Sequence, residues 1–316
     1  MSLRRRWLPI LLAGVFVVVM VALSGILRCP EVLFPETAAI LCGAWIQPVQ
    51  AWNVDRRRMI GLMCAGSVFG LLVNLLLPWP LWLRAPLGYL FCAVAMNVVG
   101  ADMTPMLSAA ILPMVLGTRE WAYPVAVTTI VCLVCLGQVK LERLGLREKI
   151  DYHTFRLAPR EAFVAWGRRL LVFCMLACPA FATGNAYLAV PPLLVAYTEL
   201  TRPDMTLRLR PRRTWCTLAL AALVGCAARN AVEYLHAPAW LVAIFAFAAL
   251  VLVWDRLHVW MPPAGALMLL AFLAPWPGPW TYFVEATIGA AVWVVVAVYL
   301  FPGIRPGVAG APAEKP

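Results

Sequence analysis

The sequence predicts an all-α polytopic membrane protein with about twelve transmembrane segments, arranged as two parallel six-helix repeats with short broken helices. Three observations predict this fold class: the composition, the series of apolar stretches, and a similarity between the two halves. Hydrophobic residues make up 63% of the 316 residues and charged residues only 13%, with a mean hydropathy of +0.84. These values lie outside the range of soluble domains. We expect a helical bundle, because a membrane β-barrel would show alternating hydrophobicity instead.

Apolar windows between polar residues, prolines and glycines predict the individual segments. The first six are 7–27, 32–49, 59–77, 83–101, 105–117 and 121–139, and the next six are 170–184, 187–200, 215–235, 239–257, 262–276 and 280–302. A basic stretch that interleaves Leu, Ile and Phe with charges separates the two sets. We therefore expect a first six-span repeat at 1–139, a cytoplasmic connector on the anionic leaflet at 140–169, a second repeat at 170–302 and a flexible cytoplasmic tail at 303–316.

The distribution of basic residues predicts the orientation. With the N-terminus in the cytoplasm, the inside segments hold 22 of the 26 lysines and arginines. The outside loops hold Arg28, Arg84 and Arg119, and Arg229 falls within a span. This bias predicts a multi-pass protein of the cell or inner membrane with both termini cytoplasmic. The short segments 105–117 and 262–276 leave a re-entrant alternative open, in which the loss of one span per half would invert the halves relative to each other.

The two halves resemble each other at an offset of 156 to 159 residues. The matched pairs are Trp121 and Trp280, Tyr123 and Tyr282, Val125 and Val284, Thr128 and Thr287, Met103 and Met261, Pro105 and Pro263, Arg57 and Arg213, and Asn74 and Asn230. Six spans per half would make the repeats parallel, related by an axis along the membrane normal. Substrate sites in such proteins lie near the bilayer midplane where the halves meet, and discontinuous helices often supply them.

The stretch "HVWMPPAGALMLLAFLAPWPGPW", residues 258 to 280, predicts one such broken helix. A helix that starts at Pro262, Pro263 and Gly265 inside the membrane would leave its first N–H groups without partners, and such an end attracts anions. Its counterpart in the first half starts at Thr104 and Pro105. The alternative is that proline simply starts a helix at the interface, where it is well tolerated.

Ionisable residues within spans are further candidates for a substrate or ion pathway. Arg229 and Glu233 lie at positions i and i+4 of one helix, so they either neutralise each other or leave Arg229 as an anion ligand. In the second case Asn230 and Asn74 would face each other across the pseudo-twofold axis. Arg229 could also extend to the interface.

Two glutamates complete the set of pathway candidates. Glu285 lies inside the last span and either relays protons or makes an interfacial hydrogen bond. Glu36, beside Thr37, lies at the start of a short span. It is either a residue of the pathway or only a carboxylate that stabilises the helix start.

Other classes of function find little support. The three histidines, His153, His236 and His258, are scattered, and no HExxH or other metal-ligand cluster occurs, so we expect no enzyme, metal or cofactor. The net charge is +11. In a membrane protein such an excess of basic residues is typical of cytoplasmic loops, so we do not expect nucleic-acid binding.

The segment "LVWDRLHVWMPPAGALMLLAFL" resembles the HPP integral-membrane family, whose name comes from a His-Pro-Pro motif. "LFPETAAILCGAW" and "RRRMIGLMCAGSVFGLLV" are similar to earlier segments of that family. Met261 stands in place of the motif histidine, and Thr104 replaces the first proline in the other half. The resemblance implies a transporter-like membrane protein, with some plant and cyanobacterial relatives linked to nitrite movement.

A weaker resemblance is to the fusaric-acid-resistance and aromatic-acid-exporter group. It rests on six-span units and on a helix start of the type Arg-x-x-Gly, here from Arg58 to Gly61. The long cytoplasmic domains of those exporters have no counterpart in this sequence. Both resemblances imply anionic substrates.

We therefore expect an integral membrane transporter for a small anion, nitrite-like or a carboxylate, with its site at the interface of the repeats. The alternatives are an aromatic or organic acid exporter and, in another class, a non-transporting membrane partner or regulatory subunit. The expected partners are the lipid bilayer and a small anionic solute, and homo-oligomer formation is left open.

Overall fold

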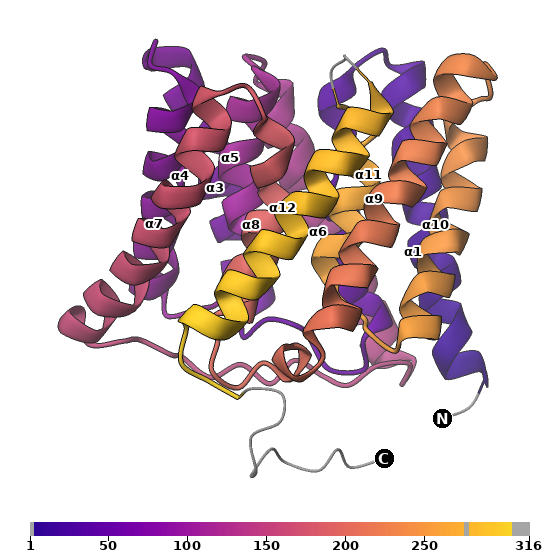
Figure 1. Cartoon of the computed structure of the whole chain (residues 1–316). Coiled ribbons are helices and arrows are strands. Elements are labelled where there is room, and N and C mark those ends of the chain that lie inside the picture. The colour runs from indigo at the N-terminus through magenta and orange to yellow at the C-terminus, as the bar shows by residue number, and fades with distance from the viewer. Residues whose placement is uncertain (1–2, 275–277, 305–316) are drawn as a thin grey trace.

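The computed structural model describes residues 3–274 and 278–304, and in this part of the chain every regular element is helical (Figure 1). The first half contains α1 (Leu3–Ile26), η1 (Pro30–Val32), α2 (Glu36–Leu41), the π-helix η2 (Cys42–Ile46), α3 (Arg56–Leu76), α4 (Leu81–Val99), α5 (Pro105–Leu116) and α6 (Ala122–Arg143). The second half contains α7 (Pro159–Ala182), η3 (Ala186–Ala189), α8 (Pro191–Leu200), η4 (Thr206–Leu209), α9 (Pro211–Tyr234), α10 (Ala239–Leu257), α11 (Pro262–Leu270) and α12 (Pro279–Leu300). The predicted tail lies, from residue 305 on, outside the described residues.

Eight of the described helices are long and apolar enough to cross a membrane. They are α1, α3, α4, α6, α7, α9, α10 and α12. Large hydrophobic side chains point outward from them, including Leu11 with 64% of its surface exposed and Phe245 with 68%. Lipid is the solvent that such an apolar outer surface requires, so the chain is a polytopic helical membrane protein.

The other four predicted segments hold only short helices, none of which is long enough to cross a membrane by itself. The segment 32–49 forms α2 and η2, and 187–200 forms η3 and α8. The remaining two form α5 with 12 residues and α11 with nine. At 1.5 Å per residue, α5 is about 18 Å long, well short of the ~30 Å hydrocarbon core. Every residue of α2, α8 and α11 is buried, so these helices are enclosed by protein.

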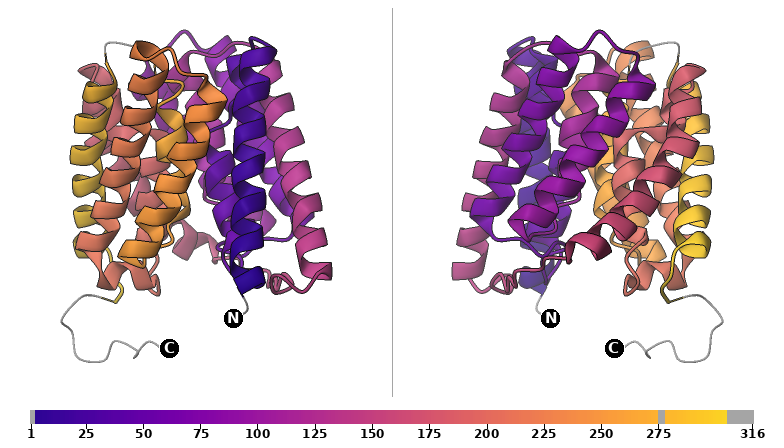
Figure 2. Two further views of the ribbon diagram at one scale, coloured as in Figure 1. Left: turned by 90° about the vertical axis from the view of Figure 1, so that its right-hand side faces the viewer. Right: turned by 90° about the vertical axis from the view of Figure 1, so that its left-hand side faces the viewer.

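The helices of the two halves follow each other in the same order. The first residues of α7, α8, α9, α10, α11 and α12 come 155 to 158 positions after those of α1, α2, α3, α4, α5 and α6. Contacts between the halves are paired in the same way: α1 packs against α10 and α4 against α7, while α2 packs against α11 and α5 against α8 (Figures 1 and 2). The short helices of both halves therefore meet each other in the centre.

Glycines bring the short helices close to the long ones. A Cβ atom on Gly70 of α3 would lie 2.0 Å from the carbonyl oxygen of Ala110 in α5, and one on Gly225 of α9 would lie 2.5 Å from that of Met268 in α11. Both distances are far inside van der Waals contact with backbone atoms. Only glycine therefore permits these two close approaches, as is common where membrane helices pack tightly.

We expect Gly70→Ala to lower the free energy of unfolding by about 1–3 kcal/mol, the range typical of overpacked sites. Gly61→Ala on the same helix is the control, because a Cβ atom there would meet nothing within 4 Å. Thermal unfolding of both variants in detergent measures the difference. Equal unfolding temperatures for the two variants would contradict the close packing of α3 on α5.

Candidate functional site

Two buried carboxyl groups, one from each half, meet the same face of α5. Thr104 and Ser108 lie one turn apart there. The Thr104 hydroxyl donates to Glu199 Oε1 of α8 over 2.8 Å, and the Ser108 hydroxyl donates to Glu36 Oε1 of α2. Glu199 is 2% exposed and Glu36 is 1% exposed. Trp52 Nε1 donates a second hydrogen bond to Glu199 Oε1, also over 2.8 Å.

The surroundings of Glu36 are incompletely hydrogen-bonded. Glu36 Oε2 and the neighbouring Thr37 Oγ1 are buried and have no hydrogen-bond partner among the described residues. Each unpaired buried polar atom costs about 1–3 kcal/mol. The hydroxyls of Tyr123 and Tyr282 lie close enough to interact electrostatically with Glu36, and they donate to the carbonyls of Ala109 (2.9 Å) and Leu267 (2.5 Å). The centre therefore contains two polar atoms, Glu36 Oε2 and Thr37 Oγ1, that can form further hydrogen bonds.

A cavity of about 820 Å³ leads from the end of the molecule where the connector lies to the vicinity of Glu199. Its inner wall includes Trp52, Thr104 and Thr198. The Thr198 hydroxyl donates to Leu194 O over 2.8 Å, so it accepts from the Tyr89 hydroxyl at 2.9 Å. Only the side chains of Trp52 and Thr104, both hydrogen-bonded to Glu199, separate a solute in this cavity from the buried carboxyl group.

The cavity carries both signs of charge. Its acidic residues are Asp102, Glu148, Asp151 and Asp204, and its Lys and Arg residues are Lys149, Arg169 and Arg202. Arg202 forms an ion pair with Asp102. Arg169 Nε donates to Thr201 Oγ1 over 2.7 Å, and its guanidinium stacks over the ring of Trp166. Charged side chains therefore surround the entrance, whereas the inner end is formed by hydroxyl and aromatic groups.

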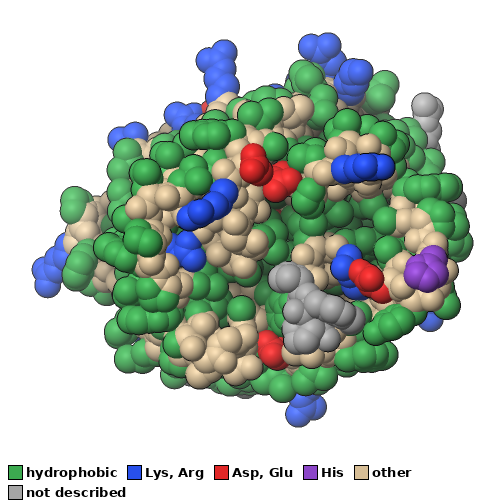
Figure 3. All heavy atoms as spheres, turned by 90° about the horizontal axis from the view of Figure 1, so that it is seen from above, with side chains coloured by type: hydrophobic (Ala, Val, Ile, Leu, Met, Phe, Trp, Pro, Cys, Tyr) green, Lys and Arg blue, Asp and Glu red, His purple; other side chains and the backbone are tan. Residues whose placement is uncertain are grey.

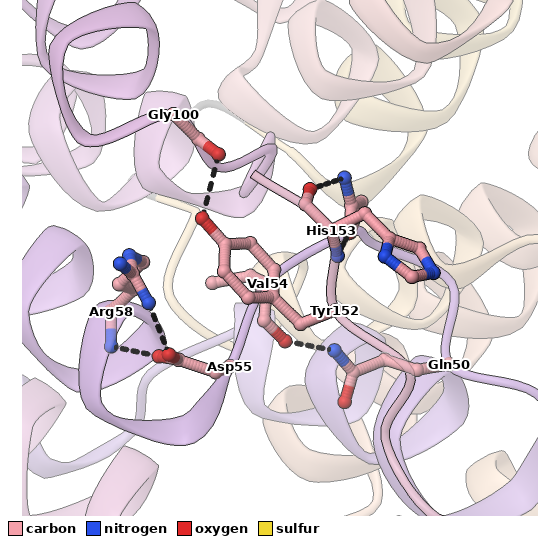
Figure 4. Close-up of polar contacts among 8 residues, drawn as sticks. Gln50, Val54, Asp55, Arg58, Gly100, Tyr152 and His153 are labelled. Carbon is pink, nitrogen blue, oxygen red and sulfur yellow. Dashed lines mark hydrogen bonds and ion pairs between the residues drawn. The ribbon is translucent and has the colours of Figure 1, made fainter. Parts of the chain in front are cut away.

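Residues of the connector line this cavity, and Figure 4 shows the polar contacts that Tyr152 and His153 of the connector make nearby. Tyr152 donates from its hydroxyl to Gly100 O over 2.8 Å, and the Arg58 guanidinium stacks on its ring. The Asn53 side chain and the His153 backbone exchange two hydrogen bonds of 2.7 and 3.1 Å. Specific contacts at the start of α3 and the end of α4 thus hold the connector.

Arg147 lies near the beginning of the connector. It is buried, and this burial lowers the pKa of its guanidinium to about 10, opposed in part by the charge of Glu142. Arg147 therefore keeps its charge at neutral pH.

The predicted anion sites at the helix starts are not available in the form we expected. Met106 N donates to Met103 O over 3.0 Å and Leu107 N to Thr104 O over 3.0 Å. In α11, Ala264 N donates to Met261 O over 3.1 Å, and Pro262 and Pro263 have no N–H group. Tight turns thus provide partners for these three N–H groups. Pro105, Pro262 and Pro263 are buried, and Gly265 packs against Ala38 of α2.

Arg229 and Glu233 pair with each other, which is the first of the two alternatives that the sequence left open. Their side chains make an ion pair of 2.5 Å on α9, and Arg229 also donates to Phe272 O over 2.9 Å. Asn74 donates to Thr118 O over 2.6 Å and accepts from Arg84, whereas Asn230 donates to Cys226 O of its own helix over 2.9 Å. The hydrogen bonds of the two asparagines stay within their own halves. These bonds are consistent with the self-paired alternative for Arg229.

Glu285 occupies a different place from Glu36. Glu285 Oε2 accepts a hydrogen bond of 3.2 Å from the backbone of Tyr187, and the ring of Tyr187 lies 5.3 Å from that of Tyr282. Of the residues predicted from the sequence, the structure thus gathers Glu36, Thr37 and Thr104 at the centre and connects Glu285 to that centre through two tyrosines.

Sequence reasoning missed Glu199. It lies at the end of the predicted segment 187–200. The signal that could have found it is a carboxyl group inside the apolar run "PPLLVAYTEL", since ionisable residues in spans are functional candidates.

Comparisons of the chain with protein-family models, with curated proteins and with solved structures found no significant match. Within residues 3–274 and 278–304, no three His, Cys, Asp or Glu side chains lie together in a way that could hold a metal ion.

Proposed function

We propose that the chain is a membrane transporter that moves a small anion, nitrite-like or a carboxylate, through the centre where the short helices meet. The observation that carries this proposal is the cavity that ends beside Glu199, a buried carboxyl group held by Thr104 and Trp52. Buried ionisable groups in membrane proteins are costly to maintain and mark substrate and ion pathways.

The cavity wall holds four acidic residues against three Lys and Arg residues, so an anion that enters it is best carried together with a proton. Arg169 and Lys149 line the route and attract an anion into it. At the inner end, an anion meets Glu199, and two like charges about 4 Å apart repel by several kcal/mol at an effective dielectric constant of 20. A proton on Glu199 removes this repulsion and supplies a hydrogen-bond donor. The proposed cycle therefore binds the proton and the anion together.

The proposal includes twelve crossings and a gene duplication. The recurrence of the helix starts and the paired contacts between the halves support the duplication. The end of the molecule where α1 begins and α12 ends also holds the starts of α3, α7 and α9 (Figure 1). Most arginines lie near these helix ends, so we place this end and both termini in the cytoplasm.

An aromatic or organic acid is the second candidate substrate. Trp52 and Trp166 line the cavity and offer flat apolar surfaces on which an aromatic carboxylate could stack. The same site would then serve an exporter rather than an importer of a small inorganic anion. Competition between nitrite and benzoate for uptake separates the two substrate classes.

Uptake of nitrite, formate and benzoate into proteoliposomes tests the proposal, with Arg169→Gln as the informative variant. Arg169 lines the cavity, and its neighbour Arg168 lies outside it. We expect Arg169→Gln to reduce uptake at least about tenfold, equivalent to ~1.4 kcal/mol of binding free energy. Arg168→Gln should transport like the wild type. Equal uptake by both variants would contradict an anion route through this cavity.

A further inference from the structure

A series of side chains that can pass on a proton extends from the cavity toward the opposite end of the molecule. It begins at Glu199, continues through the hydroxyls of Thr104 and Ser108 on α5, and ends at Glu36. We infer that this series is the proton path of the transporter. The inference rests on the proposed transport function and names the residues along which its proton moves.

At the cavity end, Glu199 is the proton acceptor. Thr104 and Trp52 donate to the same oxygen, Oε1. The charged and titratable groups that face Glu199 are the ion pair of Arg202 with Asp102 and the thiol of Cys42 in η2. Because Asp102 and Arg202 also line the cavity, a proton from the aqueous side reaches Glu199 without crossing an apolar layer.

The step between the two carboxyl groups follows α5. Thr104 and Ser108 are separated by one helical turn, a rise of about 6 Å, so a single water molecule between them completes the connection. A hydroxyl in such a chain accepts the incoming proton on its oxygen and releases its own, and no net change remains. Glu36 Oε2 and Thr37 Oγ1, both buried and unpaired among the described residues, provide the free acceptor positions that this step needs.

Beyond Glu36, tyrosines lead toward the other end of the molecule. Tyr123 of α6 and Tyr282 of α12 lie near Glu36, but their hydroxyls donate to the carbonyls of Ala109 and Leu267. The ring of Tyr187 packs edge-on against that of Tyr282. Tyr187 in turn lies near Glu285 and Arg229. Glu285 is partly exposed, and Figure 3 shows acidic side chains reaching the surface at this end. Ring packing and one backbone hydrogen bond thus connect the surroundings of Glu36 with Glu285, on the side opposite the cavity.

The path is tested by replacing Glu36 with glutamine, which keeps the shape and removes the exchangeable proton. Proteoliposomes with an internal pH dye report proton entry when nitrite is added outside, and isotope exchange at equal nitrite concentrations reports anion movement alone. We expect Glu36→Gln to keep exchange and to reduce proton entry at least tenfold, and Ser108→Ala to do the same more weakly. Glu31→Gln, five residues away in η1, should behave like the wild type. Undiminished proton entry in Glu36→Gln would overturn the path.

Infrared spectra decide the inference independently of the substrate. Spectra of wild-type protein in lipid at acidic and alkaline pH should contain C=O bands of protonated carboxyl groups that titrate and that disappear in Glu36→Gln and Glu199→Gln. If neither variant loses a titrating band, the path is wrong even where anion uptake is observed. If the bands titrate as expected and no probe anion moves in the wild type, the proposed anion transport fails and the proton path stands.

Discussion

Replacing Glu199 by glutamine is expected to reduce uptake of the transported anion at least tenfold and to remove its dependence on pH. The amide oxygen of glutamine still accepts hydrogen bonds from Trp52 and Thr104, which now hold Glu199 Oε1. The fold is therefore retained. What is lost is the exchangeable proton, and with it the coupling between proton and anion. Uptake into proteoliposomes at several external pH values measures the effect.

Glu148→Gln is the matched control, because Glu148 lies in the wall of the same cavity but outside the centre. It should transport with the pH dependence of the wild type. A Glu199→Gln protein that keeps wild-type uptake across the pH range would remove Glu199 from the transport cycle.

Replacing Arg208 by methionine is expected to lower the free energy of unfolding by at least about 3 kcal/mol, because hydrogen bonds from a charged donor contribute ~1.5–3 kcal/mol each. Arg208 is 0% exposed. Its guanidinium donates to the carbonyls of Leu200 (2.5 Å), Ala297 (3.0 Å), Val298 (2.9 Å), Phe301 (2.8 Å) and Ile304 (3.1 Å). These carbonyls lie at or just beyond the C-terminal ends of α8 and α12, where a positive charge also interacts favourably with both helix dipoles.

Thermal unfolding in detergent measures this effect, and Arg212→Met is the control because Arg212 is exposed at the start of α9. Arg208→Lys should fall between the two variants, since an ammonium group has fewer donors than a guanidinium group. Arg208→Met protein that unfolds at the wild-type temperature would show that these bonds do not stabilise the chain.

Composition and hydropathy were sufficient to predict the helical membrane class, because eight helices carry the long apolar stretches that lipid requires. They could not separate a spanning helix from a short helix enclosed by protein. The segments that became α2 and α8 are as apolar as their neighbours, but they pack against α11 and α5 rather than against lipid. A hydropathy window records composition only, and burial by other helices depends on the tertiary fold.

The candidate site was predicted in part. Glu36, Thr37 and Thr104 were chosen from the sequence and lie in the centre, since ionisable residues and broken helices in apolar sequence are informative. Arg208 was counted with the loop arginines, because its five carbonyl partners come from distant segments. The hydrogen bonds that satisfy the starts of α5 and α11 were missed for a similar reason, since proline marks a helix start without showing which turn precedes it.

Counterflow is the most direct test of transport through this protein. Proteoliposomes loaded with unlabelled nitrite, formate or benzoate are diluted into a trace of the same labelled anion, beside liposomes without protein. The proposed function predicts that at least one label accumulates transiently above its equilibrium level only where the protein is present. Labels that enter both preparations alike, for all three anions, would contradict anion transport and favour a non-transporting partner or regulatory subunit.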